Sequence, residues 1–369
     1  MKNKHFIISK DCKIVIGYNR SIIMDLTRES FFYIPNFFAK IVNNKIVDIE
    51  KVREKLNKDE LTIFESLLDV LTKREILIYG DHDYLNLFSN ISDEFDFPAI
   101  FTNLQFEESQ PNPFDEDIIN IISLLGIQAI EIRDVSISTI RNLNFLCKKS
   151  TIRSIELIID YNSISSFNLE HILIDNTRLR KITIKNAPKN EYNKNEKTGA
   201  DLIYTTENIT NFSCGKISQK LFTIGVQMFN ESNKHNNCLN KKLAIDSNGN
   251  FKNCLSMTKS YGSRYSIDPK DLLKNDEFIK HWKISKNLIN VCSDCEYRSM
   301  CLDCRVFTND KNNSVSKPSK CNYNPYISLW GNELGYKTEE ECGISFKNGK
   351  TILNIEKLNQ INKELWGEI

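Results

Sequence analysis

The sequence has almost no net charge and no long apolar run. Lys and Arg together number 49 against 48 for Asp and Glu, which gives a formal net charge of +1. A chain this close to neutrality has no overall field to hold nucleic acid or an anionic membrane surface, so we expect neither as a partner. No window approaches the roughly 20 apolar residues of a membrane-spanning helix, and the N-terminal segment lacks the apolar core of a secretory signal. We therefore expect a soluble, cytoplasmic protein.

The common catalytic motifs are also missing. The sequence contains no Gly-x-x-x-x-Gly-Lys-Ser/Thr phosphate loop, no Gly-x-Gly-x-x-Gly and no Gly-x-Ser-x-Gly nucleophile elbow. Its five histidines are scattered, and only His235, three residues before a cysteine, is a candidate metal ligand. Nucleotide binding and serine hydrolase chemistry therefore have no basis in the sequence.

Cysteine, by contrast, is abundant and clustered. The chain has eleven cysteines, an odd number that argues against a fully paired disulfide framework. Seven of them share one region, in the order Cys238, Cys254, Cys292, Cys295, Cys301, Cys304 and Cys321. Such density in a reducing compartment indicates metal binding or catalysis more often than disulfides.

The spacing of these seven residues indicates metal sites. It reads Cys-x10-Gly-x4-Cys, then Cys-x2-Cys-x5-Cys-x2-Cys, then a last cysteine after sixteen intervening residues. Thiolates are soft ligands that suit zinc and iron–sulfur clusters, and both kinds of centre take four protein ligands. Seven cysteines are one short of two complete sites, so the eighth ligand is Cys214, His235, water or a substrate group. Zinc-ribbon pairs usually lie farther apart, which favours clusters and leaves zinc as the alternative.

The sequence as a whole predicts a mixed α/β protein, in which other regions precede and follow the cysteine-rich region. Residues 1–80 predict strands at 6–8, 14–16, 22–24 and 31–34, followed by helices at 36–42, 49–56 and 61–71. Strands before helices suit a small winged-helix-like α+β module. Residues 231–330 form the loop-rich cysteine region, and residues 331–369 form a tail with a strand at 344–346, a turn at 347–350 and a helix at 355–365.

Strands alternate with helices between residues 81 and 230. Strands are predicted at 99–101, 130–132, 155–159, 182–184 and 223–226, and helices at 114–125, 136–147 and 167–174. This alternation predicts a parallel sheet that is either open or curled into a partial barrel. The polar stretch 187–200 is predicted to be a long exposed loop.

The cysteine pattern resembles the SPASM domain, which follows the catalytic barrel in many radical-SAM peptide-modifying enzymes. The sequence departs from it at Cys301-Leu-Asp-Cys304, where three intervening residues are usual. The sequence segments around the cysteines are similar to those of the SPASM-domain peptide maturases of the grasp-with-spasm systems. The order and size of the other regions are similar as well. These segments are Cys238-Leu-Asn-Lys-Lys-Leu-Ala-Ile-Asp246, Lys252-Asn-Cys-Leu-Ser-Met257, Cys292-Ser-Asp-Cys-Glu-Tyr-Arg298, Asp303-Cys-Arg305 and Lys317-Pro-Ser-Lys-Cys-Asn-Tyr-Asn-Pro-Tyr326.

This resemblance implies cofactors and partners. It implies a degenerate radical-SAM-like partial barrel at 81–230 and two auxiliary 4Fe–4S clusters in the SPASM region. One cluster would be held by Cys292, Cys295, Cys301 and Cys321. The other would be held by Cys238, Cys254 and Cys304, with a fourth ligand from upstream or an open iron. The implied partners are a precursor peptide, an ATP-grasp ligase and, for electron transfer, a redox partner.

The radical-SAM signature itself is absent. Such enzymes bind their reactive cluster through Cys-x3-Cys-x2-Cys after the first barrel strand, and residues 101–111 contain no cysteine. A Gly-Gly-Glu type of motif is also missing after the second strand. These absences argue against cleavage of S-adenosylmethionine. They leave open a peptide-delivery protein without catalysis, an atypical radical enzyme that uses an under-liganded cluster, and a structural zinc protein.

The N-terminal layout resembles the precursor-peptide recognition element of peptide-modifying systems. Such winged-helix domains accept the leader peptide as an extra strand on an exposed sheet edge. The candidate edge is 20–26, with the helix 61–71 as the wall of the groove. The acidic residues in that helix make DNA binding a poor alternative.

Overall fold

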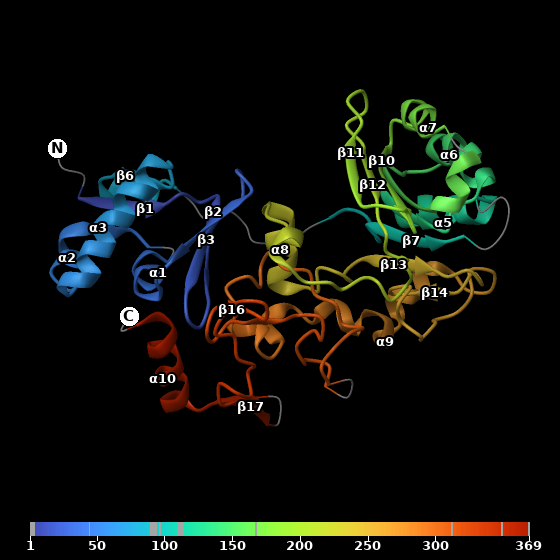
Figure 1. The fold of residues 1–369 in the computed structure, drawn as a ribbon. Helices are drawn as coiled ribbons and strands as arrows, with labels where there is room; N and C mark the ends of the chain where they lie inside the picture. The colour runs from blue at the N-terminus through green and yellow to red at the C-terminus, as the bar shows by residue number, and fades with distance from the viewer. Residues whose placement is uncertain are drawn as a thin grey trace. The chain divides into compact units, whose positions relative to one another are not determined.

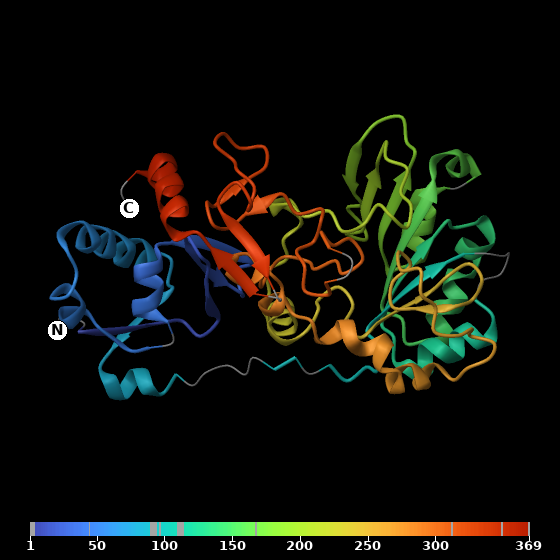
Figure 2. The same ribbon diagram turned by 90° about the horizontal axis from the view of Figure 1, so that it is seen from below.

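The computed structural model describes residues 4–43, 45–88, 94–95, 97–108, 114–166, 168–310, 313–347 and 350–367 (Figures 1 and 2). The chain divides into two compact units. Unit 1 comprises Met1–Phe95, Gly215–Asn237 and Ile284–Ile369, and unit 2 comprises Asp96–Cys214 and Cys238–Lys283. Within the described ranges, no helix has the length and apolar character needed to cross a membrane.

The N-terminal part of unit 1 contains two antiparallel three-stranded sheets. One has the order β2-β3-β4, with β2 at Cys12–Ile16, β3 at Ser21–Asp25 and β4 at Ser30–Ile34. The other has the order β5-β1-β6, with β5 at Val47–Asp48, β1 at His5–Ile8 and β6 at Leu77–Gly80. The four strands predicted before residue 35 are confirmed. The predicted peptide-accepting edge at 20–26 is wrong, because β3 is buried along its whole length and pairs with β2 on one side and β4 on the other.

The three helices predicted after these strands are confirmed, and a fourth, α4, was not predicted. They are α1 (Asn36–Val42), α2 (Ile49–Arg53), α3 (Lys58–Lys73) and α4 (His82–Asn86). Helix α3 begins with a capping box, in which Asn57 accepts a hydrogen bond from the Glu60 N–H (2.9 Å) and Glu60 accepts one from the Asn57 N–H (3.1 Å). Phe64 of this helix and Phe38 of α1 are fully buried and pack together, so both helices cover one hydrophobic core.

Unit 2 is built on one eight-stranded sheet with the order β11-β12-β10-β9-β8-β7-β13-β14. The parallel strands are β7 (Asn103–Glu107), β8 (Ala129–Arg133), β9 (Ser154–Asp160), β10 (Leu179–Lys185), β12 (Asp201–Tyr204) and β13 (Lys242–Ile245). The edge strands β11 (Glu191–Lys194) and β14 (Phe251–Lys252) run antiparallel to their neighbours. The predicted α/β class with a mostly parallel sheet is therefore confirmed.

Three of the described helices of unit 2 lie on one face of this sheet. They are α5 (Glu116–Leu125), α6 (Ile137–Lys149) and α7 (Leu169–Asp175). Because the strand order advances in one direction from β7 to β10, right-handed crossovers place all three helices on the same side, as Figures 1 and 2 show. The opposite face is polar, with Gln105, Glu131, Glu156 and Lys181 in register on adjacent strands. One-sided cover is expected for a sheet that curls toward a barrel, and not for a doubly wound sheet.

Two predicted strands of the middle region are displaced or absent. The segment predicted at 99–101 precedes the actual strand β7, because the N–H groups of Ile100 and Phe101 bond to the Leu125 carbonyl at the end of α5 and not to a strand. The segment predicted at 223–226 forms no strand. Its Thr223 N–H bonds to the Met300 carbonyl, and helix α8 (Val226–Lys234) begins at its end.

The predicted loop at 187–200 contains an edge strand instead. Strand β11 has the sequence Glu-Tyr-Asn-Lys and pairs along its full length with β12. Its polarity concealed it, because edge strands often carry charged and polar side chains that discourage association with other chains.

Most of the cysteine-rich region consists of loops and short helices, as predicted. Besides β13 and β14, which belong to the sheet of unit 2, its described elements include α9 (Asp276–Ile279), the 3-10 turns Pro269–Lys274, Lys280–Lys283, Lys286–Leu288 and Cys292–Asp294, and the strands β15 (Tyr323–Asn324) and β16 (Leu329–Trp330). Two further 3-10 turns lie upstream at Tyr161–Ser166 and Gln219–Leu221. The tail forms β17 (Ile344–Lys347), β18 (Lys350–Leu353) and α10 (Ile355–Trp366), which confirms its predicted strand and helix. Residues 348–349 of the predicted turn lie outside the described residues.

Candidate metal centre

Four of the predicted ligands come together in unit 1, namely Cys292, Cys295, Cys301 and Cys321. The first pair brackets a single 3-10 turn, in which the Cys295 N–H bonds to the Cys292 carbonyl at 3.0 Å. After burial, the largest cause, nearness to Cys321 and Cys301 also raises the pKa of Cys292, and nearness to Cys292 and Cys321 also raises that of Cys295, so the four thiols lie near one another. We call these four side chains the four-thiol centre.

Burial controls the chemistry of this centre. Burial raises the pKa of Cys292 to about 12 and also raises the pKa of Cys295 and Cys301. Thiols of this kind stay protonated at neutral pH and make poor nucleophiles, whereas a bound metal deprotonates them. The donor set therefore fits a metal centre better than cysteine-based covalent catalysis.

Two buried lysines accompany the four thiols. Lys286 is only 4% exposed, and Lys317 only 5%. Burial alone would lower the pKa of Lys286, but the charges of Cys301 and Cys292 raise it well above the usual value. The pKa of Lys317 is raised in the same way by Cys321 and Glu339 against the effect of burial. Four thiolates around a doubly positive metal core would leave two negative charges, and the two ammonium groups would offset part of this charge while also pairing with Glu339 and Asp303.

A compact group of ligand atoms lies outside the four-thiol centre. A tetrahedral zinc site with Zn–S bonds of about 2.3 Å places its sulfurs roughly 3.8 Å apart. Among the residues that the structure describes, three ligand atoms within 4.8 Å of one another occur at Asp11, Cys12 and Asp25, and not within the four-thiol centre. That carboxylate group is already engaged by protein donors, since Arg28 bonds to Asp25 at 3.0 Å and Thr27 bonds to Asp11 at 3.0 Å.

A buried ion pair fixes the second Cys-x-x-Cys pair and the segment that follows it. Asp303 is 1% exposed and accepts hydrogen bonds from Arg305 (2.6 and 3.1 Å) and from Asn236 (2.6 Å). Arg305 also donates to the Ser316 carbonyl at 2.8 Å. This pair joins segments on both sides of Cys304, so the Cys301-x-x-Cys304 turn is well anchored despite having one residue fewer than the SPASM pattern.

A second group of thiols lies in unit 2. The pKa of Cys254 is raised by a hydrogen bond with Cys214, by burial and by the charge of Cys238, so the three side chains meet. Cys214 Sγ also lies 3.1 Å from Ser256 Oγ. We call Cys214, Cys238 and Cys254 the three-thiol group. Cys214 was one of the sequence candidates for the eighth ligand.

The three-thiol group adjoins the carboxyl ends of the parallel strands. The Asn211 carbonyl accepts hydrogen bonds from Cys214 and Ser256. The Asn211 side chain accepts a hydrogen bond from Arg133 at the end of β8 (2.9 Å) and donates one to Glu107 at the end of β7 (2.8 Å). Ligand sites of parallel α/β sheets lie at this edge.

The other sequence candidates occupy different places. Cys304 is buried in unit 1, where a Cβ added to Gly215 would lie 3.1 Å from its Sγ. Its predicted co-ligands Cys238 and Cys254 belong to unit 2, and the assignment of these three to one cluster stays a prediction. His235 ends helix α8, with its ring against Phe95 at 6.3 Å between centroids.

The strand ends hold a polar group where the radical-SAM motifs were sought. Glu107 and Arg133 end β7 and β8 and are joined through Asn211, while Arg133 also bonds to Glu131 at 2.7 Å. Residues 109–111 of the segment searched for the cysteine triad lie outside the described residues.

The comparisons with known proteins give distant similarities only. No family model matches the chain, and no curated protein matches it. Among solved structures, Streptococcus suis SuiB bound to S-adenosylmethionine is similar, with 13% identity, a TM-score of 0.30, and coverage of 82% of this chain and 96% of that one. SuiB bound to its precursor peptide SuiA gives 14% identity, a TM-score of 0.28 and the same coverage. Similarity at this level establishes neither a shared fold nor a shared activity.

Proposed function

We propose that the chain is an iron–sulfur protein of peptide maturation, which binds a precursor peptide and acts on it together with an ATP-grasp ligase. The observation that carries the proposal is the four-thiol centre with its two buried lysines. The precursor peptide and the ligase are inferred as partners because the cysteine pattern resembles that of SPASM-domain maturases. When bound, such clusters supply electron-transfer or Lewis-acid chemistry.

Each of the two thiol groups would hold one cluster, so that each unit would contain one. Cys292, Cys295, Cys301 and Cys321 would hold one 4Fe–4S cluster, as the resemblance implies. The three-thiol group would contribute to a second cluster, with Cys214 as the upstream ligand.

Strand β4 is the proposed docking edge for the leader peptide. It is an edge strand of the β2-β3-β4 sheet, its first four residues are partly or fully exposed, and Tyr33 is 44% exposed. Main-chain groups on such an edge pair with an extended peptide, and alternate side chains select its sequence.

The residues at the carboxyl ends of β7 and β8 favour a chain that delivers the peptide to the ligase without radical chemistry. Glu107 and Arg133 bond to Asn211 and Glu131, and the chain has no Cys-x3-Cys-x2-Cys triad. An atypical radical enzyme is the competing hypothesis, because an incompletely liganded cluster could bind a substrate.

Reconstitution with the ligase and its precursor peptide tests the proposal. Mass spectrometry would follow ligated peptide, and chromatography would follow 5′-deoxyadenosine under reducing conditions with S-adenosylmethionine. We expect the chain to increase ligated product and to form no 5′-deoxyadenosine. Cys321→Ser should abolish the stimulation, while Cys147→Ser, which alters a thiol of helix α6 outside both groups, should retain it. A ligase rate indifferent to the chain contradicts the proposal, and 5′-deoxyadenosine formation replaces delivery with radical chemistry.

A further inference from the structure

The turn between β2 and β3 reaches the loop of the four-thiol centre. The Tyr18 N–H bonds to the Asp294 carbonyl at 2.8 Å, and Arg298 donates to the Ile16 carbonyl at 2.7 Å. A Cβ added to Gly17 would lie 2.9 Å from the Glu296 nitrogen. The N-terminal sheet and the cysteine loop are therefore in main-chain contact within unit 1.

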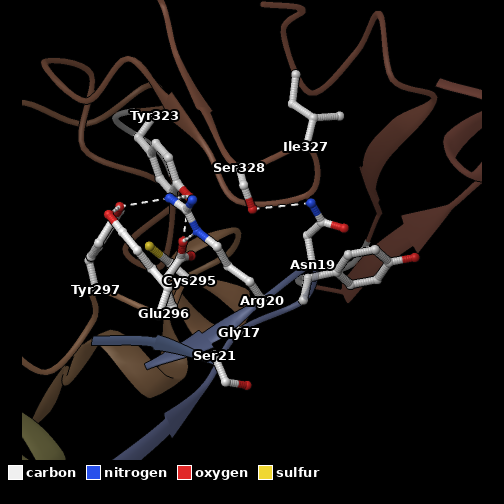
Figure 3. A network of polar contacts seen from close by, with 12 residues as sticks. Gly17, Asn19, Arg20, Ser21, Cys295, Glu296, Tyr297, Tyr323, Ile327 and Ser328 are labelled. Atoms are coloured by element: carbon white, nitrogen blue, oxygen red, sulfur yellow. Dashed lines mark hydrogen bonds and ion pairs between the residues drawn. The ribbon is translucent and has the colours of Figure 1, made fainter. Parts of the chain in front are cut away.

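Arg20 is the centre of the side-chain network at this contact (Figure 3). Its guanidinium donates to Glu296 Oε1 at 2.7 Å, to the Tyr297 hydroxyl at 2.8 Å and to the Tyr323 hydroxyl at 3.3 Å. Glu296 and Tyr323 follow the predicted ligands Cys295 and Cys321 by one and two residues. The Glu296 side chain is fully buried, so Arg20 compensates a charge that water does not reach.

The same network reaches the edge strand β4. The Arg20 guanidinium lies over the Tyr33 ring, 3.9 Å from its centroid, and the Tyr33 and Tyr297 hydroxyls are 2.6 Å apart. Tyr33 thus has one face toward solvent on the proposed peptide edge and its hydroxyl on a residue of the cysteine loop.

We propose that Arg20 is a positioning residue that couples strand β4 to the four-thiol centre, so that metal binding orders the edge that accepts the peptide. This inference rests on the proposed function. Its physical basis is that Glu296, Tyr297 and Tyr323 lie within two residues of Cys295 or Cys321, so that fixing these ligands also fixes the partners of Arg20. Coupling of this kind is reciprocal, so an ordered β4 also favours metal retention.

Hydrogen exchange on the full-length protein tests the coupling. Protein purified anaerobically would be compared before and after chelation, with iron, sulfide and zinc measured on each sample. In the wild type, removal of metal should speed exchange at 30–34 about tenfold or more, the effect of losing one charge-assisted hydrogen bond. Exchange at helix α3, whose hydrophobic core contains no cysteine of either thiol group, serves as the internal reference.

Variants separate coupling from general destabilisation. Arg20→Ala should give fast exchange at 30–34 in the metal-loaded protein, with little further change on chelation. It should also lower the reduction potential of the cluster, since a positive charge beside Cys295 is lost. Arg53→Ala is the matched control, because Arg53 pairs with Glu65 on the exposed surface at 2.6 Å. It should retain the wild-type response in both measurements.

Tyr33→Phe tests the same link if Arg20→Ala fails to fold, since it removes only the hydroxyl contact with Tyr297. It should reduce the response of 30–34 to chelation. Equal exchange at 30–34 in metal-loaded and metal-free wild type would overturn the coupling and leave the proposed function standing. Absence of metal from the anaerobic wild type would overturn both.

Discussion

At the scale of single residues, Gly17 shows how closely the N-terminal turn approaches the cysteine loop. A Cβ at this position would lie 2.5 Å from the Arg20 carbonyl oxygen and 2.9 Å from the Glu296 nitrogen, both main-chain atoms. We predict that Gly17→Ala destabilises unit 1 by about 1–3 kcal/mol, the usual cost of overpacking. Urea unfolding would measure it.

The control for this substitution is Gly225→Ala. No atom lies within 4 Å of a Cβ added there. Its backbone is extended (φ 161°), so alanine fits without strain. Equal stability of the two variants would contradict the close approach at Gly17.

Asp115 of unit 2 caps a helix and also forms an ion pair with Arg264. It accepts from the Ile118 N–H (2.9 Å) at the start of α5 and receives both guanidinium nitrogens of Arg264 at 2.8 and 2.7 Å. Burial alone would raise the pKa of Asp115, but the hydrogen bonds from Arg264 and Ile118 bring it below the usual value. This contribution to stability is present above the unfolded-state pKa of about 3.9 and is lost as the pH falls through the folded-state pKa.

Arg264→Gln should therefore cost about 1 kcal/mol at pH 7, a value discounted for the partial exposure of Asp115. The difference from the wild type should shrink as the pH falls below 4. Urea unfolding by circular dichroism at several pH values measures this, with Arg180→Gln, which alters an exposed residue of β10, as control. A difference that stays constant with pH would contradict the role of the charge.

At the scale of elements, the loop that carries each cysteine decides which of the two thiol groups the cysteine joins. We predict that Cys295→Ser, which removes one ligand of the four-thiol centre, lowers bound iron and sulfide by about half, since one of two cubane sites is lost. Cys147→Ser should leave both contents unchanged. Elemental analysis after anaerobic purification measures this, and equal metal in the two variants would exclude the four-thiol centre as a cluster site.

Cys214→Ser makes the corresponding test in unit 2. It replaces the thiol beside Cys254 with a hydroxyl of similar size, so a loss of iron would reflect ligation and not packing. We expect iron and sulfide to fall while the four-thiol centre remains loaded. Unchanged metal would show that Cys214 only packs against Cys254.

The elements predicted best from the sequence are those with strong local signals. Helix α3 has its capping box and apolar spacing, and β8, β9 and β10 are short apolar runs between helices. The sequence could not reveal β11, because its polar residues form a strand only through pairing with β12. The run at 223–226 has strand-like residues but no strand to pair with, and tertiary contacts decided its conformation.

The candidate centre was only partly predictable for a similar reason. Cysteine spacing identified ligand candidates, because two close Cys-x-x-Cys pairs rarely arise from packing alone. Lys286 and Lys317 were missed, since a charge-balancing lysine has no required spacing from the thiols that it serves. The contact of Arg20 with Glu296 joins residues 276 positions apart, and no local pattern indicates it.

At the scale of the whole molecule, each unit includes part of the cysteine-rich region. Residues 284–369 complete unit 1 and residues 238–283 complete unit 2, so the predicted SPASM stretch contributes to both. Metal bound by this stretch would contribute to the folding free energy of each unit.

The central claim is that this chain holds iron–sulfur clusters. The most direct test is anaerobic purification with iron, sulfide and zinc quantified beside an absorption spectrum. The account predicts about eight irons and eight sulfides per chain and a broad band near roughly 400 nm, as expected for two cubane clusters. A colourless protein with one or two zinc ions per chain would contradict it.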